Sequence, residues 1–241
     1  AGLLDVPADC VWLFPSGMAA IYTAHRAVTA LRPGARSVQY GFPYVDTLKI
    51  QQDLGPGAIF LPFGSEAELP ALAAALAAEP VSGVFCEFPS NPLLGSPHLQ
   101  AVSDAAAPHR VPVVVDDTIS TYANVNPLPA CDLVVTSLTK FFTGRGDVMA
   151  GAIVLNPKRP QAEALQAALA REFEDAIWGG DALVMERYAA DFVERMQKTN
   201  QTTAALTTWL RAHPAVAEVY YPLFRDRAHY DAFKRPGAGY S

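Results

Sequence analysis

Lys140 has an unusual place for a lysine, because it follows an apolar run and two hydroxyl residues in the stretch DLVVTSLTKFFTGRGD. The apolar residues at 133–135 predict a buried parallel strand, since such strands are covered on both faces and read as continuous apolar runs. Ser137, Thr139 and Lys140 would then stand at the exit of that strand. A primary amine in that place can form a Schiff base with an aldehyde, or hold and move a proton.

A carboxylate, Asp116, ends a second apolar run in the stretch VPVVVD. Taken alone, Asp116 is explained equally well as the N-cap of the residues that follow it. With a lysine at a neighbouring strand exit, it could form a Lys–Asp ion pair or hold a cofactor between the two side chains. The second arrangement fits pyridoxal phosphate, whose aldehyde would join Lys140 while Asp116 keeps the ring nitrogen protonated, so that the ring accepts electrons.

The phosphate group of such a cofactor would need donors of its own. Ser16, Gly17 and Met18 open a helical stretch, where free backbone N–H groups and the helix dipole favour an anion. By themselves, these three residues are better explained as an ordinary N-cap. Ser137 and Thr139 could add hydroxyl donors from the other side.

Three further polar residues follow predicted strands. Tyr40 could stack on the cofactor ring, although a tyrosine at a strand end is more often half-buried packing. Glu87 and Asn91 stand around two prolines, where turn formation is the simplest role for both. Each of these signals is weak alone. Their arrival at successive strand exits is what indicates a common site.

Strand-like and helix-like segments alternate through most of the chain. From patterning we predict strands at 37–40, 58–63, 82–88, 111–117, 134–140, 148–156 and 216–222. This alternation predicts an α/β fold, with a mainly parallel sheet that carries helices on both faces. The alternation yields to a long helix near residue 187. We therefore expect one domain over 1–187 and the start of a second over 188–241.

The composition bounds the class of protein and its partners. Of the 241 residues, 51% are apolar and 17% are charged, and the net charge of −6 disfavours nucleic acid and anionic membranes as partners. No apolar segment is long enough to span a bilayer, and we expect no export signal at Ala1. Cys10, Cys86 and Cys131 are isolated and lack metal-ligand spacing. We therefore predict free thiols, no metal site and a cytoplasmic location.

The strings SGMAAI, EFPSNPLL, VPVVVDDTI and SLTKFFTGRGDVMAG resemble the pyridoxal-phosphate enzymes of cysteine and methionine metabolism, the cystathionine γ-synthase and γ-lyase group. The resemblance continues to HPAVAEVYYP and so covers almost the whole chain. LFPSGMAAI, YGFPYVDTLKI and CEFPSNPLL look most like the fungal-type cystathionine γ-synthases. The resemblance implies an aspartate-aminotransferase-like large domain of fold type I, followed by the start of a small α+β C-terminal domain.

The resemblance also implies roles for particular residues. Lys140 matches the Schiff-base lysine, and Asp116 matches the partner of the pyridine nitrogen. Tyr40 matches the ring-stacking tyrosine and is counted with Lys140 as catalytic. The remaining matched cofactor-binding positions are Ser16, Gly17, Met18, Asn91, Thr118, Ser137 and Thr139.

Two departures from the family pattern bear on the site. Asp117 stands where the family usually shows asparagine, and it adds negative charge beside Asp116. Gly144-Arg145-Gly146-Asp147 replaces the usual Gly-His-Ser-Asp, so Arg145 could offset the charge of Asp117 or could be solvated.

The activity that the resemblance implies is γ-replacement on an O-acyl-L-homoserine, with cysteine as the thiol and cystathionine as the product. The alternatives are elimination by a cystathionine or methionine lyase, an O-acylhomoserine sulfhydrylase, and a binding or regulatory relative without cofactor. A homotetramer with shared active sites is expected. In the family, residues from a neighbouring subunit's N-terminal part bind the phosphate and a later arginine binds the substrate carboxylate. We expect both outside this chain.

Overall fold

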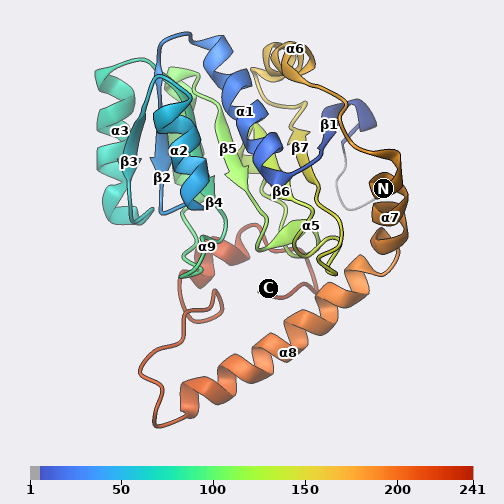
Figure 1. Ribbon diagram of the computed structural model, residues 1–241. Coiled ribbons are helices and arrows are strands. Elements are labelled where there is room, and N and C mark those ends of the chain that lie inside the picture. The colour runs from blue at the N-terminus through green and yellow to red at the C-terminus, as the bar shows by residue number, and fades with distance from the viewer. Residues whose placement is uncertain (1–5, 241) are drawn as a thin grey trace.

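A sheet of seven strands in the order β1-β7-β6-β5-β4-β2-β3 lies at the centre of the protein. The computed structural model describes residues 6–240 (Figure 1). Strand β7 is antiparallel to both of its neighbours, and the other four neighbouring pairs are parallel. The predicted α/β fold with a mainly parallel sheet is therefore confirmed. The strands are β1 (Val11–Phe14), β2 (Arg36–Tyr40), β3 (Ala58–Leu61), β4 (Val81–Glu87), β5 (Val113–Asp116), β6 (Leu133–Ser137) and β7 (Gly151–Leu155).

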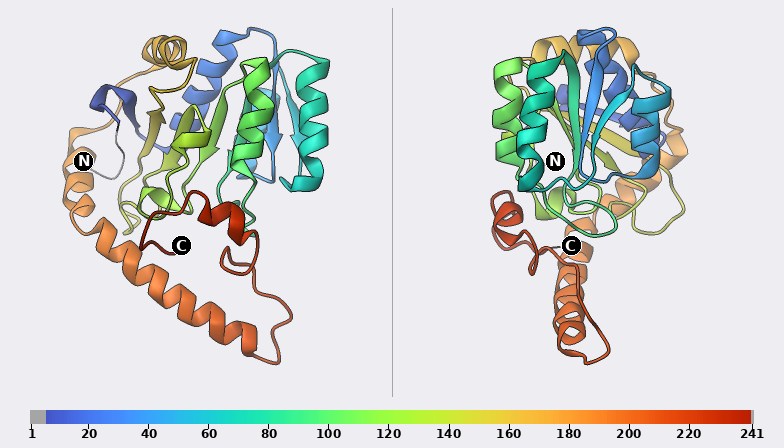
Figure 2. Two further views of the ribbon diagram at one scale, coloured as in Figure 1. Left: turned by 180° about the vertical axis from the view of Figure 1, so that it is seen from behind. Right: turned by 90° about the vertical axis from the view of Figure 1, so that its left-hand side faces the viewer.

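Helices cover both faces of this sheet, as Figure 2 shows from two further sides. One face packs against α1 and α6, and the other packs against α3 and α4. The long helix α8 leaves the body of the sheet (Figure 1). The helices are α1 (Gly17–Leu31), α2 (Val45–Asp53), α3 (Leu69–Ala78), α4 (Leu99–Ala106), α5 (Thr121–Asn124), α6 (Ala162–Glu172), α7 (Gly179–Ala189), α8 (Phe192–Ala212) and α9 (Arg227–Asp231).

The valines of β5 show why this strand lies inside the protein. Val113, Val114 and Val115 are all 0% exposed. Successive side chains of a strand point to opposite faces, so Val114 packs in one core cluster while Val113 and Val115 pack in the other. Burial of each such side chain favours folding by roughly 1.5–3 kcal/mol. The strand therefore holds Asp116 firmly at its carboxyl end.

The chain after α8 returns to the carboxyl edge of the sheet (Figures 1 and 2). Its contacts there include a bridge between Val125 and Lys234 and the stacked rings of Phe88 and Tyr230, 5.6 Å apart. The strand predicted at 216–222 is wrong. These residues are irregular, since among residues 6–240 no strand pairs with them.

The proposed domain boundary at residue 187 falls inside α7. The division into two domains stays a prediction.

Strand β1 was not identified from the sequence, because its four residues have side chains exposed on alternate positions and no flanking pattern. Within the described residues, no helix combines the length and the apolar character that crossing a membrane requires.

Candidate active site

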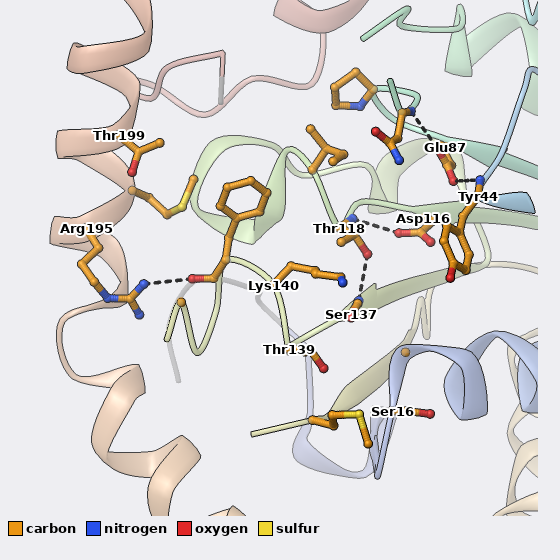
Figure 3. A pocket seen from close by; sticks show the side chains of 18 of the residues that line it. Ser16, Tyr44, Glu87, Asp116, Thr118, Ser137, Thr139, Lys140, Arg195 and Thr199 are labelled. Atoms are coloured by element: carbon orange, nitrogen blue, oxygen red, sulfur yellow. Dashed lines mark hydrogen bonds between the residues drawn. The ribbon is translucent and has the colours of Figure 1, made fainter. Parts of the chain in front are cut away.

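A cavity of about 1120 Å³ opens at the carboxyl edge of the sheet (Figure 3). It lies where β4, β5 and β6 end and α1 begins, with α8 on its far side. This is the place where open α/β sheets bind ligands. The predicted site residues that line it are Ser16, Gly17, Met18, Asn91, Asp116, Thr118, Ser137, Thr139 and Lys140.

Lys140 reaches into this cavity from the turn after β6 (Figure 3). The turn is fixed by its backbone, because Lys140 N–H donates to Ser137 O over 3.2 Å and Gly144 N–H donates to Lys140 O over 2.9 Å. The side chain is exposed, and its ammonium group has no ion-pair or hydrogen-bond partner among residues 6–240. The amine is therefore open to an incoming reactant.

Asp116 faces the same cavity from the end of β5. Its Oδ1 accepts the Thr118 N–H over 2.9 Å. Burial raises the pKa of Asp116, and the hydrogen bonds from Thr118 act in the opposite direction. No cation pairs with this carboxylate among residues 6–240. A basic ring nitrogen placed against it would supply the missing positive charge, so the site fits a protonated pyridine.

Two more carboxyl groups are buried beside Asp116. Burial, and then the charge of Asp116, raises the pKa of Glu87 to about 8. The same two causes raise the pKa of Asp117 well above its usual range, and Thr136 and Arg235 lower it to a smaller extent. Carboxyl groups crowded in this way favour the arrival of one cation at the site.

The exits of β5 and β6 are joined by a hydrogen bond. The Ser137 N–H donates to Thr118 Oγ1 over 2.8 Å, as Figure 3 marks. This bond fixes the distance between the strand that carries Asp116 and the strand that leads to Lys140. The hydrogen bond thus holds Asp116 and Lys140 in a fixed arrangement relative to each other.

The first turn of α1 is pressed against the ends of β6 and β7. A Cβ atom on Gly17 would lie 2.7 Å from Ser137 Cβ, and one on Gly151 would lie 2.8 Å from Gly17 Cα. Only glycine allows this approach. Ser16 Oγ caps the helix by accepting the Ala19 N–H over 3.1 Å. Because the first N–H groups of a helix lack partners within it, α1 presents donors that fit a phosphate.

Thr139 lines the cavity, but its hydroxyl group is already engaged. It accepts the Ala150 N–H over 2.9 Å and donates to Ala150 O over 3.2 Å. A hydroxyl has one proton to donate. Donation to a phosphate, as expected from the sequence, would require this proton to leave Ala150.

The structure contradicts the placement of Tyr40. Its side chain is 1% exposed in the core, its hydroxyl donates to Ser65 O over 2.6 Å, and it does not line the cavity that contains Lys140. Tyr44 lines that cavity instead and is 46% exposed. Tyr40 is the last residue of β2, whereas Tyr44 directly precedes α2 at the ligand-binding edge, and no signal in the sequence alone separates the two.

Arg145 does not offset Asp117. Its guanidinium pairs with Asp191 over 3.3 Å and lies over the ring of Tyr188, 4.6 Å from the ring centre. This is an exposed surface arrangement. Burial disfavours the ionised form of Asp117 by raising its pKa, and the arginine that acts in the opposite direction is Arg235, not Arg145.

A separate cluster lies outside the cavity, where Glu66, His98 and His229 come close enough to share an ion. His229 Nε2 lies 3.2 Å from Glu66 Oε1. However, His98 Nδ1 accepts the Ala101 N–H over 3.2 Å, so the proton of a neutral His98 ring is on Nε2. In this arrangement His98 offers no lone pair to a metal, and the absence of a metal site stays a prediction.

A mainly parallel sheet with a lysine and a partly buried aspartate at neighbouring strand exits, facing a helix N-terminus, defines a site of the pyridoxal-phosphate enzyme class. The chain belongs to the family described as Cys/Met metabolism PLP-dependent enzymes, whose sequence profile matches residues 4–241. The predicted family, cofactor class and enzyme class are confirmed by this match.

Individual relatives agree with the family. The chain is 43% identical to the cystathionine γ-synthase of Neurospora crassa, over 99% of this chain and 40% of that protein. It is 44% identical to an alanine racemase of Aspergillus violaceofuscus, over 91% of this chain and 38% of that protein. The apo structure of a methionine γ-lyase from Micromonospora echinospora superposes with a TM-score of 0.79 at 27% identity, over 99% of this chain and 64% of that one. The chain thus spans about two fifths of the length of these two sequence relatives. The structural match confirms the prediction of fold type I.

Proposed function

We propose that the protein performs γ-replacement on an O-acyl-L-homoserine, with cysteine as the incoming thiol and cystathionine as the product. The observation that carries the proposal is the convergence of Lys140 and Asp116 on one cavity at neighbouring strand exits. The 43% identity to a cystathionine γ-synthase supports the choice of reaction within the family.

Different residues of the cavity would bind different parts of the cofactor. The first turn of α1 and Ser137 would bind the phosphate, and Asp116 would bind the ring nitrogen. Tyr44, in place of Tyr40, would stack on the ring, and Asn91 and Thr118 lie beside it. When bound, pyridoxal phosphate supplies an aldehyde for the substrate amine and a ring that accepts electrons.

Lys140 would move the protons of the reaction. Its Nζ is within the cavity and unpaired, so it can remove the proton from the α-carbon of the substrate and later return a proton. Asp116 helps by keeping a positive charge at the ring nitrogen, which favours loss of the α-proton. Loss of a second proton, from the β-carbon, would supply the electron pair that expels the acyl group from the γ-carbon as a carboxylate. The thiol would lose its proton and add to the γ-carbon, and protons would return to the β- and α-carbons.

Two other outcomes start from the same removal of the α-proton. One solved neighbour is a methionine γ-lyase, and one relative at 44% identity is an alanine racemase. Elimination and racemisation are therefore the alternatives to test. Nothing in the positions of Lys140 and Asp116 separates them from replacement, because all three reactions begin with removal of the α-proton by a base.

The decisive experiment offers the full-length protein O-acetyl- and O-succinylhomoserine, each with and without cysteine. Cystathionine that forms only when both substrates are present supports the proposal. Keto acid released from cystathionine alone would identify a lyase, and D-alanine formed from L-alanine would identify a racemase. Lys140→Ala should abolish every product, whereas Lys158→Ala, at an exposed lysine after β7, should leave the product pattern unchanged.

We further propose a homotetramer in which neighbouring subunits share active sites. Large exposed apolar side chains support this assembly. Met149 lines the cavity and is 67% exposed, Trp178 is 73% exposed, and Leu183 on α7 is 67% exposed. Such surface is usually covered in the assembled protein. Sedimentation of the full-length enzyme measures its state, and an active monomer would contradict the proposal.

We propose a cytoplasmic location for the protein. Cys10, Cys86 and Cys131 are buried free thiols, and free thiols persist in a reducing compartment. Fractionation of the producing cell tests this location, and recovery of the protein outside the cytoplasm would refute it.

A further inference from the structure

Glu87 joins two loops at the mouth of the cavity. It ends β4 directly opposite Asp116 in the sheet register, and it is 8% exposed. Its Oε1 accepts the N–H of Tyr44, and its Oε2 accepts the N–H of Asn91 over 2.9 Å. Figure 3 shows the first of these bonds crossing to the residue that precedes α2. One carboxylate thus ties the loop after β2 to the loop after β4.

We propose that Glu87 is a positioning residue, whose carboxylate holds the Tyr44 loop and the Asn91 loop in the arrangement that receives the cofactor ring over Asp116. The inference deepens the proposed function, because it assigns a role in that same site to a residue whose sequence context indicated only a turn. Glu87 touches no reacting atom in this role. It acts through Tyr44 and Asn91.

The chemistry of the two contacts requires a carboxylate. Both donors are backbone N–H groups, so both partner atoms must accept. The two oxygens of an ionised carboxylate can do this, and glutamine cannot, because its NH₂ group would face one of the two donors. A buried donor left without an acceptor is unfavourable, so the loop on that side should loosen.

The surroundings of Glu87 argue that the contact has a function. Burial and Asp116 disfavour the ionised form, while the hydrogen bonds from Tyr44 and Asn91 favour it. An apolar side chain would fill the same space without this opposition. A cation bound at Asp116 would weaken the repulsion between the two carboxylates, so loop positioning and binding of the protonated ring favour each other.

Glu68 provides a matched control. Its Oε2 accepts two backbone N–H groups, from Phe63 over 2.9 Å and from Gly64 over 2.7 Å. It therefore makes the same kind of contact on the loop after β3. Glu68 does not line the cavity that contains Lys140. Because one oxygen accepts both donors here, glutamine can keep both bonds, so Glu68→Gln should leave its own loop and the cofactor site intact.

The test compares Glu87→Gln with Glu68→Gln in the full-length protein, using two readouts that do not depend on γ-replacement. The first is amide hydrogen exchange in the apo protein, above the Glu87 pKa. We expect exchange at Tyr44 and Asn91 to rise about tenfold in Glu87→Gln, and exchange at Phe63 and Gly64 to stay unchanged in Glu68→Gln, where one oxygen still accepts both donors. The second is the affinity for pyridoxal phosphate, followed by absorbance. It should fall about tenfold in Glu87→Gln alone.

Unchanged exchange at Tyr44 and Asn91 would overturn the inference. So would faster exchange with unchanged cofactor affinity, because Glu87 would then be merely structural. If Glu87→Gln does not fold, Glu87→Asp keeps both oxygens on a shorter side chain and should show the same two effects to a smaller degree. A protein that binds the cofactor but makes no cystathionine would refute the proposed reaction and leave these two readouts to decide the role of Glu87.

Discussion

Replacement of Gly17 by alanine should weaken both the fold and the cofactor site. The new Cβ would lie 2.7 Å from Ser137 Cβ and 2.9 Å from Ser137 Oγ. Carbon atoms normally stay about 3.5–4.0 Å apart, so the first turn of α1 or the end of β6 must shift. Because both elements would contribute groups for the phosphate in the proposed site, a small shift should act directly on cofactor binding.

The expected magnitude follows from two opposing effects. Overpacking of a tight site typically destabilises a protein by about 1–3 kcal/mol. Exchange of glycine for alanine at a backbone position that alanine can adopt stabilises by about 0.4–1 kcal/mol. Taken at the middle of each range, the two effects leave a net loss at Gly17 of about 1.3 kcal/mol in the free energy of unfolding, together with a several-fold loss of affinity for pyridoxal phosphate.

Gly179 gives the matched control, because it is the first residue of α7 as Gly17 is the first residue of α1. A Cβ on Gly179 would meet nothing within 4 Å. Gly179→Ala should therefore be neutral or slightly stabilising, with unchanged cofactor affinity. Urea unfolding and absorbance titration of the two variants measure both quantities. A Gly17→Ala protein as stable and as tightly binding as the parent would refute the close approach between α1 and β6.

Three further perturbations follow from the site and the core. Asp116→Asn should keep the fold and lose most turnover, and Asp116→Ala should also weaken cofactor binding; near-normal turnover in both would make this carboxylate merely structural. Tyr44→Ala should lower cofactor affinity, whereas Tyr40→Phe should lower stability by about 1 kcal/mol and leave affinity unchanged, because its hydroxyl bonds only to Ser65 O. His25 is 2% exposed, and burial lowers its pKa to about 4 from 6.5. Since only the unfolded chain binds this proton between those values, stability should fall by up to about 3 kcal/mol as the pH drops through that window. His25→Leu should flatten this acid limb in urea unfolding, and an unchanged limb would contradict the argument.

The chemistry at the strand exits was readable from the sequence because it depends on local patterns. Asp116 and Lys140 each follow an apolar run, and such runs form the inner strands of a parallel sheet. The error at Tyr40 arose where two tyrosines stand four residues apart. Only the packing of the strand decided that Tyr40 turns into the core while Tyr44 stays at the edge.

Other features depended on contacts that a pattern does not contain. The apolar and aromatic run at 216–222 is typical of a strand, but a strand forms only where a neighbour pairs with it. The sequence left open whether Arg145 offsets Asp117 or is solvated, and only the contacts of its guanidinium with Asp191 and Tyr188 on the surface decide for the second. The role proposed for Glu87 could not be predicted from the sequence, because both of its partners are backbone groups.

The place of β7 in the sheet has a consequence for the order in which the site can be built during folding. β4, β5 and β6 follow one another in the chain and lie side by side, so the strand exits of Glu87, Asp116 and Ser137 come together by short-range closure. β1 reaches the sheet only through β7, in a register that pairs Val11 with Val154. The loop between β1 and β7 is much longer than those between β4, β5 and β6, so its closure costs more entropy and is slower. It also cannot precede the synthesis of β7, which ends at residue 155. The first turn of α1 is pressed against Gly151 of β7 as well as against Ser137 of β6, so this half of the site takes its final form only after β7 has joined the sheet.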